Sequence, residues 1–242
     1  MHLPQYFPRV GAKRIVVFIH GFMGGPDQFG ELMEAVGAKG FSAASLLLPG
    51  HGGTGMAFAR VTAEAWEEHV LRELGRFGEY DELALVGHSI GGLLALLAAV
   101  EGRYKIGKLV LLSTPLKVHL LHPMALARRL RVLGVPGELR TEYLRARSVK
   151  LFPWLPLYVR TLLQPHRLMR KTRARLGDVT VPTLIFLSER DETTSYKTAK
   201  LFAEGLTRAP HEIVTLRRSY HAHYTADERR LITARLLAFL DE

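Results

Sequence analysis

The amino-acid sequence predicts an α/β fold, namely a doubly wound and mostly parallel β-sheet with a helical insertion. Short β-rich apolar runs alternate with segments in which apolar residues recur at helical spacing, as right-handed β–α–β crossovers require. Most of the short runs are apolar on both faces, which is typical of parallel strands covered by helices on both sides. We expect strands at 14–19, 41–48, 83–86, 108–113, 182–187 and 211–216.

Helices are predicted between and after these strands. Asp27 precedes the first helical pattern and is a residue type that caps helix N-termini. Thr225 and Glu228 form a capping-box pattern at the start of the last helix. The helices are expected at about 29–36, 62–77 and 90–100, and from 225 through 240.

One long segment interrupts the alternation. Between the strand that ends near Ser113 and the strand that begins at Pro182 lie over sixty residues without a convincing strand, but with helical patches and several prolines. We therefore predict a core of residues 1–114 and 176–242, with 115–175 inserted over the sheet as a helical cap.

The net charge of +10 comes from the same segment. Residues 115–175 hold 14 of the 33 Lys and Arg but only two acids, whereas the rest of the chain has 19 basic and 21 acidic residues. A nucleic-acid-binding face would need aromatic residues among the bases or a recognised module, and neither is evident, so we expect no nucleic-acid partner. Two interpretations remain: a solvated helical face, or a cap with an apolar inner side at 151–163. Such a cap could attract an anionic substrate or contact a membrane surface transiently.

Composition excludes several classes of protein. The chain has 242 residues, 48% of them hydrophobic and 23% charged, which argues against disorder. It has no cysteine, so it offers no disulfide, no thiol nucleophile and no zinc–thiolate site. The stretch MHLPQYFPRVGAKR lacks a signal-peptide pattern, and no apolar run approaches the roughly 20 residues of a membrane-spanning helix. We expect a soluble, cytoplasmic protein.

A serine stands between a predicted strand and a predicted helix. The sequence Gly87-His88-Ser89-Ile90-Gly91 reads G-x-S-x-G, and in this context it predicts a nucleophile elbow, a tight turn that projects the serine hydroxyl beyond the sheet. Side chains two residues on either side would collide across such a turn, so both positions are glycine. The N-terminus of the following helix points at the serine, and the Ile90 N–H is suited to hold a developing oxyanion.

The residues around this serine resemble those of a known superfamily. GHSIGG at 87–92 and FIHGFMGG at 18–25 resemble the α/β-hydrolases, and most of all the bacterial carboxylesterases and monoacylglycerol lipases. The resemblance covers about 1–114 and 176–242, and relatives place a variable cap where 115–175 lies. It implies that the Phe22 N–H is a second oxyanion donor, while His20 supports that loop by hydrogen bonding.

The resemblance also implies where the partners of Ser89 lie. In this fold an acid and then a histidine follow the serine, on loops after later strands. Asp191, in SERDETT, matches the position of the acid, whereas Glu189 and Glu192 could be solvated charges. After the earlier strand no acid is found before Glu138, which supports Asp191 by elimination.

The histidine is sought in RRSYHAHYTADE, which follows the last predicted strand. His221 and His223 are both candidates, and Ser219-Tyr220-His221 resembles the S-G-H of relatives, which favours His221. Tyr220 replaces the usual glycine, so the conformation of the loop stays open. As a metal pair the two histidines have no third ligand obviously beside them, and we expect no metal site.

A second glycine motif is discounted. Residues 50–55 satisfy G-x-G-x-x-G after a strand, but MAFARVT follows instead of an evident helix, and no strand ending in an acid occurs about twenty residues on. The sequence LPGHG also resembles a loop of the α/β-hydrolases. We therefore expect no nicotinamide cofactor and, for the predicted chemistry, no cofactor at all.

The function that these patterns favour is a serine hydrolase of carboxylic esters. Ser89 would attack the acyl carbon, His221 would carry its proton, and Asp191 would orient the imidazole, with Phe22 and Ile90 at the oxyanion. Short- to medium-chain acyl esters or monoacylglycerol-like lipids are the expected substrates. Thioesterase, lysophospholipase and acyltransferase activities use the same framework. A catalytically dead hydrolase fold that only binds its ligand is the non-enzyme alternative.

Overall fold

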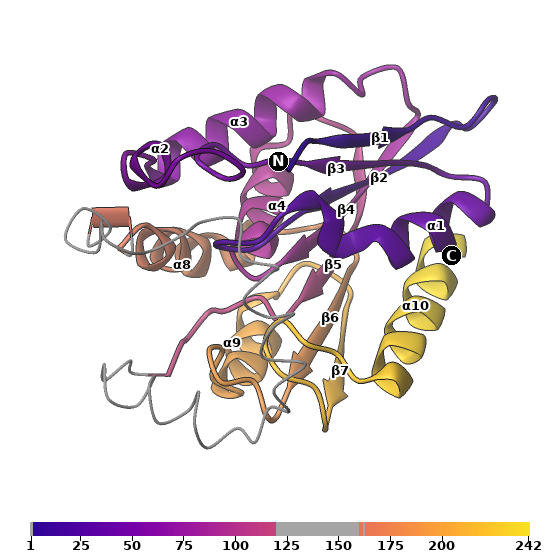
Figure 1. Ribbon diagram of the computed structural model, residues 1–242. Helices are drawn as coiled ribbons and strands as arrows, with labels where there is room; N and C mark the ends of the chain where they lie inside the picture. The colour runs from indigo at the N-terminus through magenta and orange to yellow at the C-terminus, as the bar shows by residue number, and fades with distance from the viewer. Residues whose placement is uncertain (1, 120–159, 162) are drawn as a thin grey trace.

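The computed structural model describes residues 2–119, 160–161 and 163–242, and a seven-stranded sheet forms its centre (Figure 1). The strand order is β1-β3-β2-β4-β5-β6-β7, in which only β1 is antiparallel to its neighbour. The strands are β1 Gln5–Phe7, β2 Arg14–Ile19, β3 Ser42–Leu46, β4 Glu82–His88, β5 Ile106–Leu112, β6 Thr183–Ser188 and β7 His211–Leu216.

All six predicted strands are present, and the doubly wound sheet is confirmed. Two have the predicted limits, β2 and β7, and the others differ by one or two residues at each end. The edge strand β1 was not predicted, because it is short and its Tyr6 and Phe7 are exposed. A strand of this kind lacks the doubly apolar pattern that marks the buried ones.

Helices cover both faces of the sheet (Figure 1). Side chains alternate along β2, so that Ile15 and Val17 enter one core cluster while Val16 and Phe18 enter the other. The larger cluster is closed by α2, α3, α4, α8 and α9, and the smaller by α1 and α10. The helices are η1 Pro26–Phe29, α1 Gly30–Ala38, α2 Gly55–Ala59, α3 Ala63–Gly75, α4 Ile90–Glu101, α8 Gln164–Arg175, η2 Leu176–Asp178, α9 Lys197–Gly205 and α10 Ala226–Asp241.

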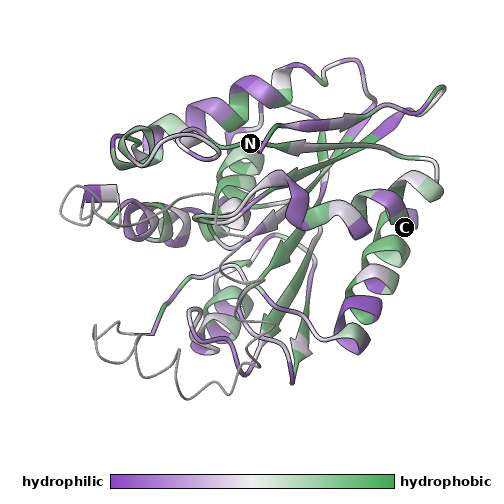
Figure 2. Ribbon diagram, in the orientation of Figure 1, coloured by the Kyte–Doolittle hydropathy of each residue, from purple (hydrophilic) through white to green (hydrophobic). Residues whose placement is uncertain are grey.

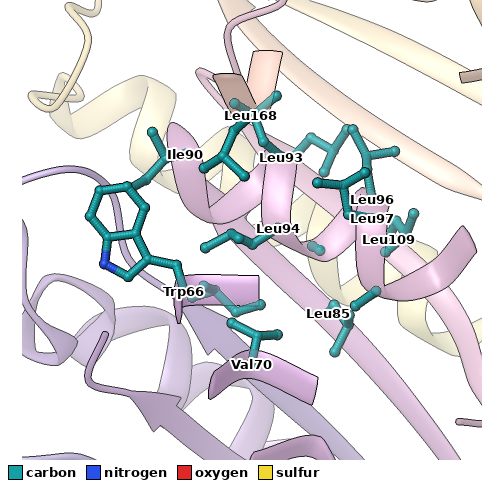
Figure 3. Close-up of a cluster of buried hydrophobic side chains, with 14 of the residues drawn as sticks. Trp66, Val70, Leu85, Ile90, Leu93, Leu94, Leu96, Leu97, Leu109 and Leu168 are labelled. Atoms are coloured by element: carbon teal, nitrogen blue, oxygen red, sulfur yellow. The ribbon is translucent and has the colours of Figure 1, made fainter. Parts of the chain in front are cut away.

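Helix α4 is apolar nearly all round, unlike the two-coloured helices at the surface (Figure 2). Such a helix is stable only when it is covered on every side. Helices α3 and α8 pack against it, and Leu168 of α8 lies beside Leu93 of α4 (Figure 3). The core around Ser89 therefore includes residues of α8.

Two predicted caps differ from those in the structure. Asp27 lies inside η1, whose N-cap is Gly25, and its carboxylate contacts the His2 ring at 2.6 Å instead. Helix α10 does begin after Thr225, but the Thr225 side chain makes no capping bond. Glu228 accepts hydrogen bonds from the Arg217 and Arg218 N–H groups, at 2.6 and 3.1 Å, rather than completing a capping box. Loop contacts thus outcompete the local pattern.

Two helices were missed at the sequence level. Helix α2 begins at Gly55, directly after the G-x-G-x-x-G pattern, so the expectation that no helix follows this motif was wrong. It is only five residues long, and the Thr54 hydroxyl caps it by accepting the Ala57 N–H at 3.2 Å. Helix α9 covers the sheet beside β6, with Phe202 buried.

The predicted cap, 115–175, falls mostly outside the described residues, and its boundaries stay a prediction. Of its described part, α8 packs onto α4 and buries Leu168 and Met169 in the larger core cluster. Among the described residues, no helix is long and apolar enough to cross a membrane.

If α8 is part of the core, Leu168→Ala should lower the free energy of unfolding by about 2–5 kcal/mol, as a cavity in a packed core does. Leu168 is 0% exposed. Leu163→Ala, at a residue that is 53% exposed just before the same helix, should change it by less than about 0.5 kcal/mol. Urea denaturation measures both. Equal effects would show that α8 is not held by the core.

Candidate active site

Ser89 occupies a strained turn between β4 and α4. Its backbone has φ 53° and ψ −121°, a conformation that residues other than glycine rarely adopt. A Cβ on Gly87 would lie 2.4 Å from the Cα of Gly92, and one on Gly91 would lie 2.0 Å from the Ile19 carbonyl oxygen. The chain therefore closes this turn only because both positions lack a side chain, as the sequence pattern predicted.

Three predicted residues from distant parts of the chain meet at this turn. The Nε2 of His221 lies 2.9 Å from the Oγ of Ser89. The Nδ1 of His221 lies 2.9 Å from Oδ2 and 3.1 Å from Oδ1 of Asp191. Ser89, Asp191 and His221 are 5%, 4% and 8% exposed. The arrangement is a continuous hydrogen-bonded chain from hydroxyl to imidazole to carboxylate.

The Asp191 carboxylate is held by backbone groups as well as by the imidazole. Its Oδ1 accepts the N–H groups of Thr193 and Thr194 at 2.8 and 2.6 Å. Burial raises the pKa of Asp191. The charge of His221, its hydrogen bond and these two N–H groups together lower the pKa by more, so it lies below its usual value. Asp191 is therefore ionised at neutral pH.

The pKa of His221 moves in the opposite direction. Burial lowers it, but the charge of Asp191, the hydrogen bond to Asp191 and then the charge of Glu192 raise it more, so the pKa lies above its usual value. The imidazolium that forms when His221 takes a proton is thus stabilised. Since the Nδ1 faces a carboxylate, it carries the proton, which leaves Nε2 free to accept the Ser89 proton.

The backbone of His221 is fixed from two sides. Its N–H donates to Oε2 of Glu192 at 3.0 Å, and its carbonyl accepts Nε2–H of His88 at 2.8 Å. Tyr220, which replaces the usual glycine, does not have a positive φ, so the loop needs no glycine there. Ser188, at the end of β6, donates its hydroxyl to the Ser219 carbonyl. The loop before His221 is thus held by hydrogen bonds and adopts ordinary backbone geometry at Tyr220.

The alternative histidine makes different contacts. The carbonyl of His223 accepts the Tyr220 N–H at 2.8 Å, which closes the turn that presents His221. The hydrogen bonds to Ser89 and Asp191 come from the His221 ring. This geometry favours His221 over His223.

The loop after β2 lies directly over the serine. A Cβ on Gly21 would lie 3.0 Å from the Cβ of Ser89 and 2.7 Å from Nδ1 of His88. The predicted oxyanion donor Phe22 follows Gly21, and its ring packs against Phe58 with the centroids 5.0 Å apart. The other predicted donor, the Ile90 N–H, belongs to the first turn of α4, where no carbonyl of the helix can accept it.

Two buried histidines brace this loop. The Nε2 of His20 accepts the Leu48 N–H at 3.1 Å, so its Nδ1 carries the proton that is donated to the Gly21 carbonyl at 2.9 Å. The Nε2 of His51 accepts the Met23 N–H at 3.0 Å. Burial lowers the pKa of His51 to about 4, and burial followed by the charge of His51 lowers that of His20 well below its usual value. Both rings are neutral supports, as predicted for His20.

Sequence reasoning missed three contributors to the site. Glu192 was considered a solvated charge, but it holds the His221 backbone. His88 was treated only as the variable residue of G-x-S-x-G, and His51 only as part of LPGHG. The position of His88 and His51 inside motifs was a signal in the sequence that they support the site. Nothing in the sequence around Glu192 indicates its contact with the His221 backbone. Among the described residues, no group of three or more His, Asp or Glu side chains could hold a metal ion.

Comparison with known proteins shows the family of this chain. A family model described as serine aminopeptidase, S33, matches residues 11–228. The chain belongs to this family of α/β hydrolases. It is 29% identical over 227 residues to a thermostable monoacylglycerol lipase of Bacillus sp. (strain H-257), covering 93% of this chain and 89% of that protein.

Solved structures share the same fold as this member of the S33 family. A soluble variant of monoglyceride lipase from Saccharomyces cerevisiae superposes with a TM-score of 0.76 at 16% identity, covering 98% of this chain and 90% of that one. A monoacylglycerol lipase from Paleococcus ferrophilus gives a TM-score of 0.71 at 18% identity, covering 98% of each chain. The α/β-hydrolase fold expected from the resemblance is therefore confirmed.

Replacing the Asp191 carboxylate should reverse the direction in which the pKa of His221 is shifted. In Asp191→Asn the raising interactions with the carboxylate are lost while burial remains, so the pKa of His221 should fall markedly from its raised value. NMR titration of the imidazole, with the resonance assigned from His221→Gln, measures the change. Asp178→Asn, at an exposed carboxylate paired with Arg175, should leave the titration unchanged. An unchanged pKa in Asp191→Asn would contradict the coupling.

Proposed function

We propose that this protein is a serine hydrolase that cleaves carboxylic esters through an acyl-enzyme intermediate. The observation that carries the proposal is the chain of two hydrogen bonds, each 2.9 Å, from Ser89 Oγ through His221 to Asp191. Serine is a weak nucleophile until an adjacent base takes its proton, and that base needs an orienting acid. The S33 family model and the Bacillus lipase similarity support the same class of reaction.

The reaction follows from the order of these groups. As the Ser89 oxygen attacks the acyl carbon, Nε2 of His221 accepts its proton and Asp191 stabilises the imidazolium. The tetrahedral oxyanion is held by the N–H groups of Phe22 and Ile90. Collapse expels the alcohol, which leaves with the proton from His221. A water molecule then attacks the acyl-serine with His221 as base, which releases the acid and regenerates the Ser89 hydroxyl.

The proposed substrates are monoacylglycerol-like lipids or short- to medium-chain acyl esters. Support comes from the relative in Bacillus, which is named a monoacylglycerol lipase and is similar over nearly the whole chain. Thioesters and lysophospholipids present the same trigonal acyl carbon to the same three residues, so they are the comparison substrates. The proposed location is the cytoplasm.

Ser89→Ala should lower kcat/KM for p-nitrophenyl butyrate by about 10⁴-fold or more, because it removes the nucleophile. A fluorophosphonate probe should label the wild type and fail to label this variant. The matched control is Ser42→Ala, at a buried serine that begins β3, whereas Ser89 follows the last residue of β4. It should keep both activity and labelling. Folded wild-type protein that the probe does not label would favour a binding protein with a dead hydrolase fold.

The loop over the serine supplies a second test. Gly21→Ala introduces a Cβ within 2.7 Å of His88 and 3.0 Å of the Ser89 Cβ, so the Phe22 N–H must shift. Because a displaced oxyanion donor costs about 10²-fold or more, kcat should fall by that order while KM changes little. Gly53→Ala, whose Cβ would meet nothing closer than Ala57 at 4.0 Å, should be neutral. A normal kcat in Gly21→Ala would argue against Phe22 as donor.

A further inference from the structure

A cavity lies between the segment that follows β5 and helix α8. Its volume is about 830 Å³, which is in the range of sites that hold a small molecule. One wall is formed by residues 116–119 and the other by residues 163–173.

The walls of the cavity are attached to the loop that carries Asp191 and to the helix that follows Ser89. In the first wall, the His119 N–H donates to the Thr193 carbonyl at 3.0 Å and the Lys117 carbonyl accepts the Ser195 N–H at 2.8 Å. Residues 193–194 are those whose N–H groups hold Asp191. The second wall, α8, packs on α4, which begins directly after Ser89 (Figure 3). The two walls are therefore held by the elements that position Ser89 and Asp191.

The lining of the cavity combines two chemistries. Its apolar part is formed by Leu116, Val118, Leu163 and Met169. Its charged part is cationic, and among the described residues no Asp or Glu lines it; the cations are Lys117, Arg167, Arg170 and Arg173. A lining of this kind complements a molecule with a hydrocarbon part and an anionic group.

The cations of α8 fall into two sets. On one side of the helix Lys171 pairs with Glu67 at 2.6 Å, and Arg175 near its end pairs with Asp178 at 2.5 Å. The exposed Arg170 and Arg173, which line the cavity, have no ion-pair partner among the described residues. Two guanidinium groups that face this cavity, with no carboxylate in the described part of its lining, are thus available to a ligand.

Arg167, the third arginine of the lining, also interacts with an acid. The pKa of the Glu64 carboxyl lies below its usual value because of hydrogen bonds from the backbone of Glu64 and from Thr62, followed by the charges of Arg167 and Lys171. Arg167 therefore interacts with α3 as well as with the cavity. Arg170 and Arg173 are the residues on which a test should act.

We propose that this cavity binds the anionic group of an amphiphilic ester, a phosphate or carboxylate, with Arg170 and Arg173 as the specificity-determining residues. The inference rests on the proposed esterase function and narrows its substrate class to negatively charged acyl esters. Guanidinium groups suit it because they bind phosphate and carboxylate oxygens through two parallel hydrogen bonds.

Binding is measured first without hydrolysis. In the Ser89→Ala background, isothermal calorimetry with octyl phosphate and with octanol compares an anionic and a neutral amphiphile below their aggregation concentrations. Octyl phosphate should bind more tightly, and R170Q/R173Q should weaken its binding by roughly tenfold, as expected for the loss of two exposed charge contacts. The effect should shrink in high salt.

The matched control is K171Q/R175Q, which removes the same charge from the same helix at residues that are already ion-paired. It should leave the affinity for octyl phosphate unchanged, and circular dichroism should show that both double variants fold. In the Ser89-containing enzyme, the ratio of kcat/KM for an acylglycerol phosphate over the matched monoacylglycerol should fall in R170Q/R173Q only. Equal losses in both double variants, or equal binding of octanol and octyl phosphate, would overturn the proposal.

A lipid surface is the other source of the same headgroup chemistry. If R170Q/R173Q releases the protein from phosphatidylglycerol vesicles but leaves octyl phosphate binding intact, the arginines serve a membrane surface and the subsite is overturned. Octyl phosphate binding that depends on Arg170 and Arg173 in a protein without any esterase activity would instead refute the proposed function while the anion site stands.

Discussion

The buried contact between the Asp191 carboxylate and the His221 imidazole is the interaction on which the site depends. A carboxylate that is 4% exposed is costly to bury unless charge and hydrogen bonds compensate it. The imidazole and the N–H groups of Thr193 and Thr194 provide that compensation. Because the carboxylate stays ionised, it sets the tautomer of His221 and raises the pKa of that ring, which makes Nε2 the acceptor that faces Ser89.

Histidine has two different roles in this site. Burial lowers the pKa of His51 and of His88 to about 4, and neither ring has a carboxylate beside it that raises the pKa enough to compensate. These neutral rings hold backbone: His51 accepts the Met23 N–H, and His88 donates to the His221 carbonyl. Of these three histidines, His221 is the one that faces a carboxylate whose effect on the pKa outweighs that of burial. One buried charge thus separates a histidine that can carry a proton from histidines that position loops.

Backbone strain is concentrated at the same edge of the sheet. Among the described non-glycine residues, positive φ occurs at Met23, Ser89 and Ser113, which follow β2, β4 and β5. Such conformations persist where surrounding contacts hold them in place. Here Gly91 lets the turn that holds Ser89 approach the Ile19 carbonyl, Nε2 of His51 accepts the Met23 N–H, and the Tyr224 hydroxyl lies 3.1 Å from Oγ of Ser113. The central parallel strands end together, so their strained residues surround one site.

The sequence by itself determined the parallel sheet, the turn around Ser89 and the residue types that accompany it, because doubly apolar runs and G-x-S-x-G are local patterns with one physical interpretation. It also pointed to Asp191 and His221, although through resemblance rather than geometry. Tertiary structure alone decided that Glu192 holds the His221 backbone, that Glu228 binds the loop before His221 instead of capping α10, and that Arg170 and Arg173 face a cavity while Lys171 is paired. Those contacts join side chains to groups as far as 104 residues away along the chain, as in the pair of Lys171 and Glu67. The partner of an acid or a base is set by which segments the fold brings side by side.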